Sequence, residues 1–249
     1  MSAWQPVDCH AHTTWSDGTL EMEELVARVQ GLGVRPGIAD HVSYDVAYSI
    51  KSVEAAHAYI EALEQHPVAR GAEFCWHDDL WRELPAELLA RLTHRVGSLH
   101  GVFLPGGGLL HLWDRALPDG LAPDEYMAVH VENLERFAAE MPVDILAHPT
   151  LVSLPLRGLP PEELWTEALE ERAARALAAA GIAFELSARY PPHERFVRCA
   201  QALGVRFSLG SDGHTPEQVG QLDSPRALAG VVGIPDDALF DPWRDARNR

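Results

Sequence analysis

The chain alternates short apolar runs with longer segments whose apolar residues recur at the spacing of a helix. Seven apolar runs read as strands, at residues 4–9, 34–39, 68–74, 95–99, 143–147, 182–186 and 205–209. Amphipathic segments that predict helices lie at residues 20–32, 52–65, 85–92, 123–140, 161–180 and 194–203. Strands that alternate with helices in this way predict a parallel α/β barrel. The 249 residues suit one such barrel or two small domains, and because no linker is visible we expect a single domain over 1–249.

Local signals predict the ends of helices and one long loop. The segment 20–32 has acidic residues in its first turn, where they suit the helix dipole, and Gly31 and Gly33 end it. The clearest helix is predicted at 161–180, which follows two prolines and ends before Gly181. Residues 101–121 contain three consecutive glycines and predict a structureless loop of the kind that serves as a lid or a binding loop.

Residue types that bind metal ions stand at or just after the ends of the predicted strands. His10 and His12 follow the first run, and because strand side chains repeat with period two, both imidazoles point the same way and can hold one ion. The carboxyl ends of barrel strands meet on one face, so ligands that are distant in sequence can meet there. The predicted ligands are His10, His12, Asp17, His41, Glu73, His100, His148, Asp212 and His214. One histidine at a strand end is more often structural, but six histidines together with three acidic residues predict a centre with more than one ion.

The remaining histidines lie mostly in predicted helices or loops, where a surface role is expected. They are His57, His66, His77, His94, His111, His130 and His193. His111 and His193 fall in loops on the predicted active face, so they are candidates for a role there.

Composition narrows the class of protein. The chain is 47% hydrophobic and 23% charged, which is ordinary for a soluble globular protein, and no apolar run approaches the roughly 20 residues of a membrane span. The first residues have no basic and apolar regions of a signal peptide, so we expect a cytoplasmic enzyme that does not bind a membrane. Cys9, Cys75 and Cys199 are too few and too widely spaced for a disulfide framework or a thiolate zinc site, which suits a reducing compartment.

The charge of the chain bears on its partners. A formal net charge of −17 repels a phosphate backbone, and Lys and Arg form no dense basic block. Bound divalent ions would neutralise several of the acidic groups, so the negative net charge does not exclude a small anionic substrate. We therefore expect no long nucleic acid as a partner, and the oligomeric state is left open.

The strand-end residues resemble the motifs of the polymerase and histidinol phosphatase superfamily, the PHP domain. The similar segments are His10-Ala11-His12-Thr13 with Ser16-Asp17-Gly18, then Ala39-Asp40-His41, Gly71-Ala72-Glu73 and Gly210-Ser211-Asp212-Gly213-His214. The resemblance covers nearly the whole chain. It implies a distorted seven-stranded (β/α) barrel with the metal site at the carboxyl ends of the strands.

The resemblance also implies a centre of three divalent ions. His10, His12, Glu73 and Asp212 would hold one ion, Glu73, His100 and His148 a second, and Asp17, His41 and His214 a third. Glu73 would then bridge the first two. Histidine and carboxylate ligands suit zinc, iron and manganese alike, so two or three ions of any of these metals are expected.

Such a centre accounts for phosphoester chemistry on physical grounds. A hydroxide shared between adjacent cations has a depressed pKa and can attack phosphorus in line, while the cations neutralise charge on the phosphoryl oxygens. No serine or cysteine nucleophile is needed. Arg189 and, second, Arg157 are the candidate phosphate contacts, because the planar guanidinium fork suits phosphate, although both could be surface arginines. Asp40 either orients an imidazole or caps the local turn.

Three functions stay open. The size of the chain and the segments 98–100 and 210–220 resemble stand-alone histidinol phosphatases, which favours a small-molecule phosphomonoesterase that acts on histidinol phosphate, a compound of histidine biosynthesis. Residues 16–20 are closer to relatives that hydrolyse nucleotides or short oligonucleotides, and the segment Glu185-Leu186-Ser187 departs from the more usual asparagine of its motif. A nucleotide phosphoesterase or nuclease is therefore the alternative. A metal-binding domain without turnover is the third.

Overall fold

The computed structural model describes residues 4–245, and its strands occur at all seven predicted runs. The third run is divided into two short strands, and one further short strand follows directly after the second run. The strands of the runs are β1 (Val7–Asp8), β2 (Arg35–Ile38) with β3 (His41–Val42), β4 (Ala69–Arg70) with β5 (Glu73–Cys75), β6 (Val96–Ser98), β9 (Ile145–Leu146), β10 (Ala183–Ser187) and β11 (Phe207–Gly210). The single-domain prediction also covers residues 1–3 and 246–249, which lie outside the described residues, and it stays a prediction.

The runs pair in parallel, as predicted. One sheet has the order β1-β2-β4 and the other β11-β10-β9-β6-β5-β3. The two sheets meet at the end of the second run and within the third, because β2 leads into β3 and β4 into β5. The strand pairs do not close into one continuous barrel, but the Cys9 amide donates to the Leu209 carbonyl at 2.9 Å and links the first run to the last. The predicted parallel α/β fold is confirmed in this interrupted form.

Most helices occur where the amphipathic pattern predicts them. These are α1 (Met22–Gly31), α2 (Val53–Leu63), α4 (Ala86–Leu89), α5 (Pro123–Glu140) and α8 (Glu194–Ala202). Shorter or later elements have no counterpart in the prediction: α3 (Leu80–Glu83), the 3₁₀ helix η1 (Leu154–Leu156), α9 (Asp223–Val232), η2 (Asp236–Ala238) and α10 (Pro242–Asp245).

The prediction of one continuous helix at 161–180 is wrong. The segment forms α6 (Pro161–Leu164) and α7 (Glu167–Ala180), and Trp165 between them is buried with a ψ of 86° that no helix contains. The Thr166 hydroxyl accepts from the Leu169 amide and caps α7, so a new helix begins there. Gly181 ends α7 in the left-handed region, as its position predicts.

The long structureless loop predicted at 101–121 is also corrected. Its first half is an antiparallel hairpin of β7 (Gly101–Phe103) and β8 (Leu109–His111). Residues 106–108 are all glycines with positive φ, which forms the turn without steric cost. Val102 and Leu110 are buried between the hairpin and the body of the protein, so the hairpin has an apolar face.

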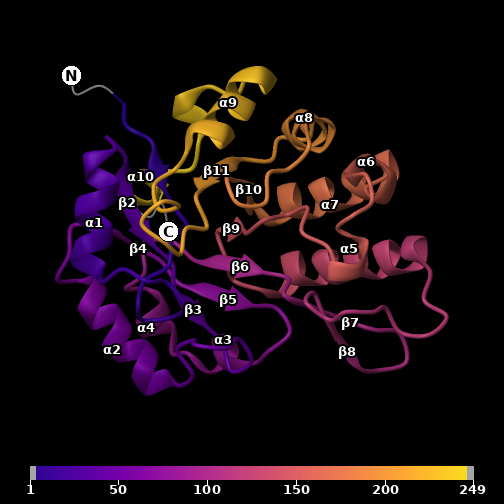
Figure 1. The fold of residues 1–249 in the computed structure, drawn as a ribbon, viewed down its shortest axis with the longest axis horizontal. Coiled ribbons are helices and arrows are strands. Elements are labelled where there is room, and N and C mark those ends of the chain that lie inside the picture. Colours follow the sequence, from indigo (N-terminus) through magenta and orange to yellow (C-terminus); the bar gives the residue numbers. More distant parts are fainter. Residues whose placement is uncertain (1–3, 246–249) are drawn as a thin grey trace.

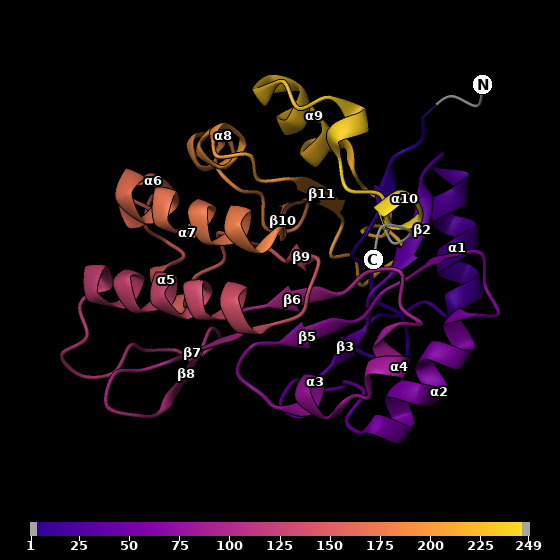
Figure 2. The same cartoon turned by 180° about the vertical axis from the view of Figure 1, so that it is seen from behind.

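The helices enclose the strands on both sides. Figure 1 shows the strands in the middle, with α1 and α2 along one side and α5 to α8 along the other, and Figure 2 shows the same arrangement from behind. Leu25 of α1, Tyr59 of α2 and Phe137 of α5 are fully buried against the sheet. In the part of the chain that the structure describes, no helix combines the length and apolar character needed to cross a membrane.

Candidate metal centre

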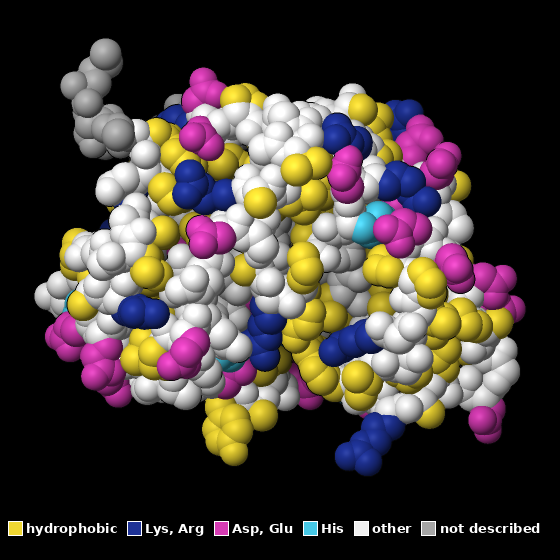
Figure 3. Space-filling view, turned by 45° about the horizontal axis from the view of Figure 1, so that its top comes forward, with side chains coloured by type: hydrophobic (Ala, Val, Ile, Leu, Met, Phe, Trp, Pro, Cys, Tyr) yellow, Lys and Arg dark blue, Asp and Glu magenta, His cyan; other side chains and the backbone are white. Residues whose placement is uncertain are grey.

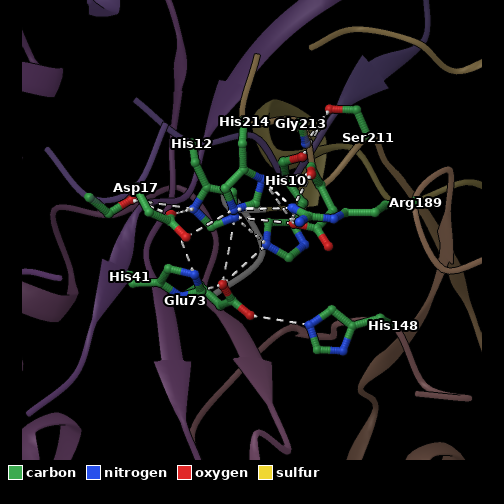
Figure 4. A network of polar contacts seen from close by, with 12 residues as sticks. His10, His12, Asp17, His41, Glu73, His148, Arg189, Ser211, Gly213 and His214 are labelled. Atoms are coloured by element: carbon green, nitrogen blue, oxygen red, sulfur yellow. Dashed lines mark hydrogen bonds and ion pairs between the residues drawn. The ribbon is translucent and has the colours of Figure 1, made fainter. Parts of the chain in front are cut away.

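The predicted ligands converge around the carboxylate of Glu73, which begins β5. Glu73 Oε2 lies 2.7 Å from His41 Nδ1 and 3.3 Å from His10 Nε2. On the other side, Glu73 Oε1 lies 3.4 Å from His148 Nε2 and 3.5 Å from His100 Nε2. Figure 4 shows the side chains of His10, His41 and His148 gathered around Glu73. The carboxylate therefore stands between two groups of imidazoles.

The remaining predicted ligands extend the cluster toward the last run. His12 Nε2 lies 3.1 Å from His10 Nε2 and 3.4 Å from Asp212 Oδ1. His214 Nε2 lies 3.2 Å from Asp17 Oδ2. All nine predicted ligands thus meet in one place. Three sets in it have ligand atoms close enough to share an ion: His12, Asp17, His41 and His214; His10, His12 and Asp212; and His41, Glu73 and His100.

The environment of Glu73 fits a cation. The residue is fully buried, and the contacts of its carboxylate oxygens among the described residues are to imidazole nitrogens, none of them in full hydrogen-bond geometry. A buried carboxylate is costly unless positive charge compensates it. Nitrogens of neutral imidazoles and carboxylate oxygens are the donor set that zinc, iron and manganese share. The residues present therefore fit divalent metal ions, although the structure does not define their number.

Protonation in the cluster is set by burial and by the crowding of like groups. Burial would raise the pKa of Glu73, but the imidazoles of His41, His10 and His100 outweigh it and hold that pKa well below its usual range. Burial, followed by the neighbouring His41 and His214, lowers the pKa of His12 well below that of a free histidine. Glu73 is thereby an anion and His12 a neutral imidazole, which are the forms that bind metal.

Two other imidazoles have raised pKa values, which favours protonated forms that a metal would displace. Burial opposes a charge on His10, but Glu185 and Glu73 raise the pKa of His10 well above its ordinary value. Glu73 likewise raises the pKa of His41 in spite of its burial. Metal ions at these nitrogens would release the protons, so the affinity for metal should fall as the pH falls.

The backbone is strained at two of the predicted ligands. His148 has φ 33° and Asp212 has φ 49°, values in the left-handed region that residues with a side chain rarely adopt. Hydrogen bonds hold both conformations, because the His148 amide donates to Glu185 Oε2 at 2.7 Å and the Asp212 amide donates to the His10 carbonyl at 2.8 Å. Strain of this kind is typical of functional sites.

Glu185, which the sequence pointed to only as part of a departure from a motif and not as a site residue, contacts two of the predicted ligands. It is fully buried on β10, and its Oε1 lies 2.8 Å from His10 Nδ1, which leaves His10 Nε2 to face the cluster. Gly210 makes room for it, because a Cβ at position 210 would lie 2.1 Å from Glu185 Oε1. The available signal was an acidic residue inside an apolar strand.

Two more buried groups support ligands from behind. Asp8 accepts hydrogen bonds from the Ser211 amide at 2.8 Å and the Gly220 amide at 2.9 Å, which holds the loop before Asp212. Burial raises the pKa of Asp8 to about 6. Cys75 is fully buried and has its Sγ 3.2 Å from His100 Nδ1, so it also orients a predicted ligand.

Asp40 is bonded to the turn that carries Asp17. Its carboxylate accepts from the Thr13 amide and hydroxyl at 2.7 Å and from the Ser16 hydroxyl at 2.6 Å. The Ser16 hydroxyl in turn lies 3.4 Å from His12 Nδ1. Asp40 therefore stabilises the local turn directly through hydrogen bonds. It can orient the imidazole of His12 only indirectly, through the Ser16 hydroxyl.

The two candidate arginines differ in their surroundings. Arg189 Nη1 lies 2.6 Å from His214 Nδ1 and 3.7 Å from Asp212 Oδ1, and its side chain is 37% exposed at the cluster. Arg157 donates to the carbonyls of Val152 and Leu112 and stacks on Trp113. Arg189 therefore faces the cluster, whereas Arg157 is engaged by the backbone beside it.

A cavity of about 550 Å³ opens over the cluster. Its lining includes Glu73, Asp212 and Arg189, together with the aromatic side chains of Tyr48, Trp113 and Tyr190. His111 lines it too, which places one of the two candidate loop histidines at the cavity. The other, His193, instead has its Nε2 2.6 Å from Glu170 Oε1.

The expected surface role is wrong for His94 and His130, which are buried, and for the side chain of His77, which is 1% exposed.

Comparison with known proteins finds similar solved structures but no similar sequence family. No protein-family model and no curated protein sequence matches the chain. A histidinol phosphate phosphatase from Lactococcus lactis, solved with zinc, L-histidinol and phosphate, has a TM-score of 0.71 at 14% identity, over 93% of this chain and 95% of that one. A structure from Listeria monocytogenes named for histidinol phosphatase HisK has a TM-score of 0.69 at 18% identity, over 86% of this chain and 97% of that one.

These likenesses show the fold. The carboxyl transferase domain of Rhizobium etli pyruvate carboxylase also matches, with a TM-score of 0.50 at 10% identity, over 98% of this chain and 39% of that one. Proteins with different chemistries thus share the general architecture, and function must be argued from the site. The likeness to the two histidinol phosphatase structures confirms the fold that the resemblance to the PHP superfamily implies.

Proposed function

We propose that this protein is a metal-dependent phosphoesterase that hydrolyses a small phosphate monoester. The observation that carries the proposal is the fully buried Glu73 carboxylate, whose oxygens are surrounded by the imidazoles of four predicted ligands. The fold shared with the zinc-containing structure of a histidinol phosphate phosphatase supports it. A domain that binds metal without turnover is the competing explanation.

The nine predicted ligands would hold two or three ions of zinc, manganese or iron. Such ions supply an activated water as nucleophile and neutralise charge on the phosphoryl oxygens. Glu185, Asp8 and Cys75 hold the ligands His10, Asp212 and His100 in place from behind. Because the supporting partners are buried, the ligand geometry is prepared before substrate binds.

Arg189 is the proposed phosphate contact. It stands beside His214 and Asp212 at the cavity, and its guanidinium can offer two parallel donors to phosphate oxygens. Arg157 is the weaker candidate, since two backbone carbonyls already occupy its donors. Arg189→Ala should raise the KM for a phosphomonoester by roughly 10- to 100-fold, the value of a hydrogen bond to a charged group. Arg157→Ala serves as the matched control and should change KM less.

Histidinol phosphate is the proposed substrate. The segments 98–100 and 210–220 resemble histidinol phosphatases, and the Lactococcus structure contains L-histidinol and phosphate. A cavity of about 550 Å³ has the size of a small-molecule site. On the face shown in Figure 3, basic side chains are scattered among acidic ones, which together with the net charge of −17 argues against a long nucleic acid.

A nucleotide is the second candidate substrate, because aromatic side chains line the cavity. Tyr48, Trp113 and Tyr190 offer ring faces on which a base could stack. Histidinol phosphate presents an imidazole to the same surfaces, so assays must separate the two.

The test is a comparison of substrates on one preparation. The protein is stripped of metal, reloaded with manganese, iron or zinc, and assayed with histidinol phosphate, nucleoside monophosphates and a short oligonucleotide. A preference of at least tenfold in kcat/KM for histidinol phosphate is expected. A preference for the nucleoside monophosphate or oligonucleotide would favour the alternative, and no release of product with any metal would favour the domain without turnover.

A further inference from the structure

We propose a second divalent-cation site at the mouth of the cavity, formed by Asp45, His77 and His111. One ligand atom from each residue lies within 4.8 Å of the other two. His77 Nε2 is 2.8 Å from Asp45 Oδ2, and His111 Nδ1 is 3.2 Å from the same oxygen. None of these residues belongs to the nine predicted ligands. We call this group the mouth cluster.

The geometry of the two imidazoles suits coordination. Their rings are 5.4 Å apart and stand at 89° to each other, so their nitrogens approach Asp45 from different directions. The His77 side chain is 1% exposed, and its Nδ1 has no hydrogen bond to any described residue. The polar interactions of His77 are therefore directed at the mouth cluster.

The backbone brings these residues together from three parts of the chain. The segment that carries Asp45 is tied to the segment after His77, because the Tyr44 amide and the Ser43 hydroxyl donate to Asp78 Oδ2. His111 ends β8 and pairs with Gly101, the residue after the predicted ligand His100. The mouth cluster is thus anchored next to the metal centre.

The chemistry of the donors indicates the kind of ion. Two imidazoles with one carboxylate form the ligand set of open zinc and non-haem iron sites, which leave further positions for water or another molecule. Asp45, His77 and His111 all line the cavity. The open positions of an ion there would therefore face a bound small molecule and accept an oxygen or nitrogen from it. This inference does not depend on the proposed phosphoesterase activity.

The competing explanation is a hydrogen-bonded contact that fixes the loop at Asp45 to the hairpin. Both imidazoles could donate to Asp45 without any ion, and Asp45 is 46% exposed. Such a contact would bind no metal, so metal content separates the two explanations.

The experiment counts ions and locates them. Wild type, His111→Ala and Asp45→Asn are stripped of metal, dialysed against zinc and measured by elemental analysis, with circular dichroism to check the fold. His57→Ala is the matched control, because His57 is a histidine on α2 with a side chain that is 52% exposed. His111→Ala and Asp45→Asn should each hold one ion fewer per chain than wild type and His57→Ala. Anomalous diffraction at the zinc edge of wild-type crystals should show a peak among Asp45, His77 and His111.

Equal ion counts in all four proteins, with no anomalous peak at the mouth cluster, would overturn the inference. So would an equal loss in His57→Ala. His12→Ala separates this inference from the proposed function, because it should remove ions from the centre and leave the peak at the mouth cluster. A peak at the mouth cluster in a protein without phosphoesterase activity would support the inference while the proposed function fails.

Discussion

The metal centre and the mouth cluster contain the same types of side chain, imidazoles and carboxylates, but the surrounding structure holds them in different ways. The centre stands on strand ends, and its ligands are backed by buried partners such as Glu185 behind His10. The mouth cluster stands on a loop, on the segment after β5 and on a hairpin, and Asp45 is 46% exposed. A site supported by buried hydrogen bonds has little freedom to adjust, whereas a site on loops can move with what it binds. The centre should therefore govern activity, and the mouth cluster should be lost at little cost to the fold.

The largest effect is expected for His12→Ala. His12 lies close to ligands on both sides of the centre, so its loss removes donors from two of the possible metal sets. Turnover should fall well beyond the roughly 10- to 100-fold that loss of a ligand's hydrogen-bond partner causes. Elemental analysis should show fewer bound ions, and circular dichroism an intact fold. Full activity in this variant would contradict the assignment of the centre.

The next largest effect is expected for His130, a buried histidine that belongs neither to the metal centre nor to the mouth cluster. Burial lowers the pKa of His130 to about 4, compared with 6.5 for a free histidine. The unfolded chain therefore binds more protons than the folded one between these values, and stability rises with pH across that window. Acidification from pH 6.5 to 4 should cost up to about 3 kcal/mol through this residue.

Urea unfolding at several pH values tests this. The wild type should lose stability relative to His130→Leu as the pH falls from 6.5 to 4, and the difference between the two should be constant above pH 7. Metal release affects both proteins alike, so it cancels in the comparison. A difference that does not change with pH would show that His130 does not titrate in this range.

Glu185→Gln tests the support behind the centre. The amide keeps the volume but removes the charge that orients His10 and accepts from the His148 amide. Metal affinity should fall by roughly 10- to 100-fold. Competition with a chromophoric chelator measures it, and Glu171→Gln on the exposed face of α7 is the control. Unchanged affinity would mean that the ligands hold their places without this partner.

The smallest effect is expected for the mouth cluster. His111→Ala should change the free energy of unfolding by about 0.5 kcal/mol or less in the absence of metal, because its side chain is 38% exposed. Chemical denaturation of the stripped proteins measures this. A loss of several kcal/mol would show that the mouth cluster is a structural element of the fold and would remove the contrast with the centre.

The strand ends could be predicted because a short-range rule applies to them. Period-two alternation predicts that His10 and His12 point the same way, and their ring nitrogens do meet although β1 ends at Asp8. The parallel arrangement of the strands predicts that the other strand ends lie at the same face. Glu185 could not be assigned in this way, because the partner of a buried acid depends on which strands are neighbours. The mouth cluster depends on a loop and a hairpin, whose positions follow from tertiary contacts that no local pattern contains.

The two wrong predictions of secondary structure, the loop at 101–121 and the continuous helix at 161–180, have a common physical cause. The glycines at 106–108 have the composition of a flexible loop, but the residues on both sides pair as the antiparallel strands β7 and β8. At 165–166 the helical periodicity continues, although Thr166 is a good capping residue and starts a new helix. In both places the deciding factor was a turn or a cap rather than hydrophobicity.

The left-handed backbone at His148 and Asp212 has a consequence for how the protein can change over time. Glycine at either position would relax the main chain and could make the empty protein easier to fold, yet it would delete a donor. Selection for stability of the metal-free protein alone would therefore replace His148 and Asp212 with glycine. Their retention in a natural lineage would report continued use of the bound ions, and their replacement by glycine would mark a copy that has abandoned them.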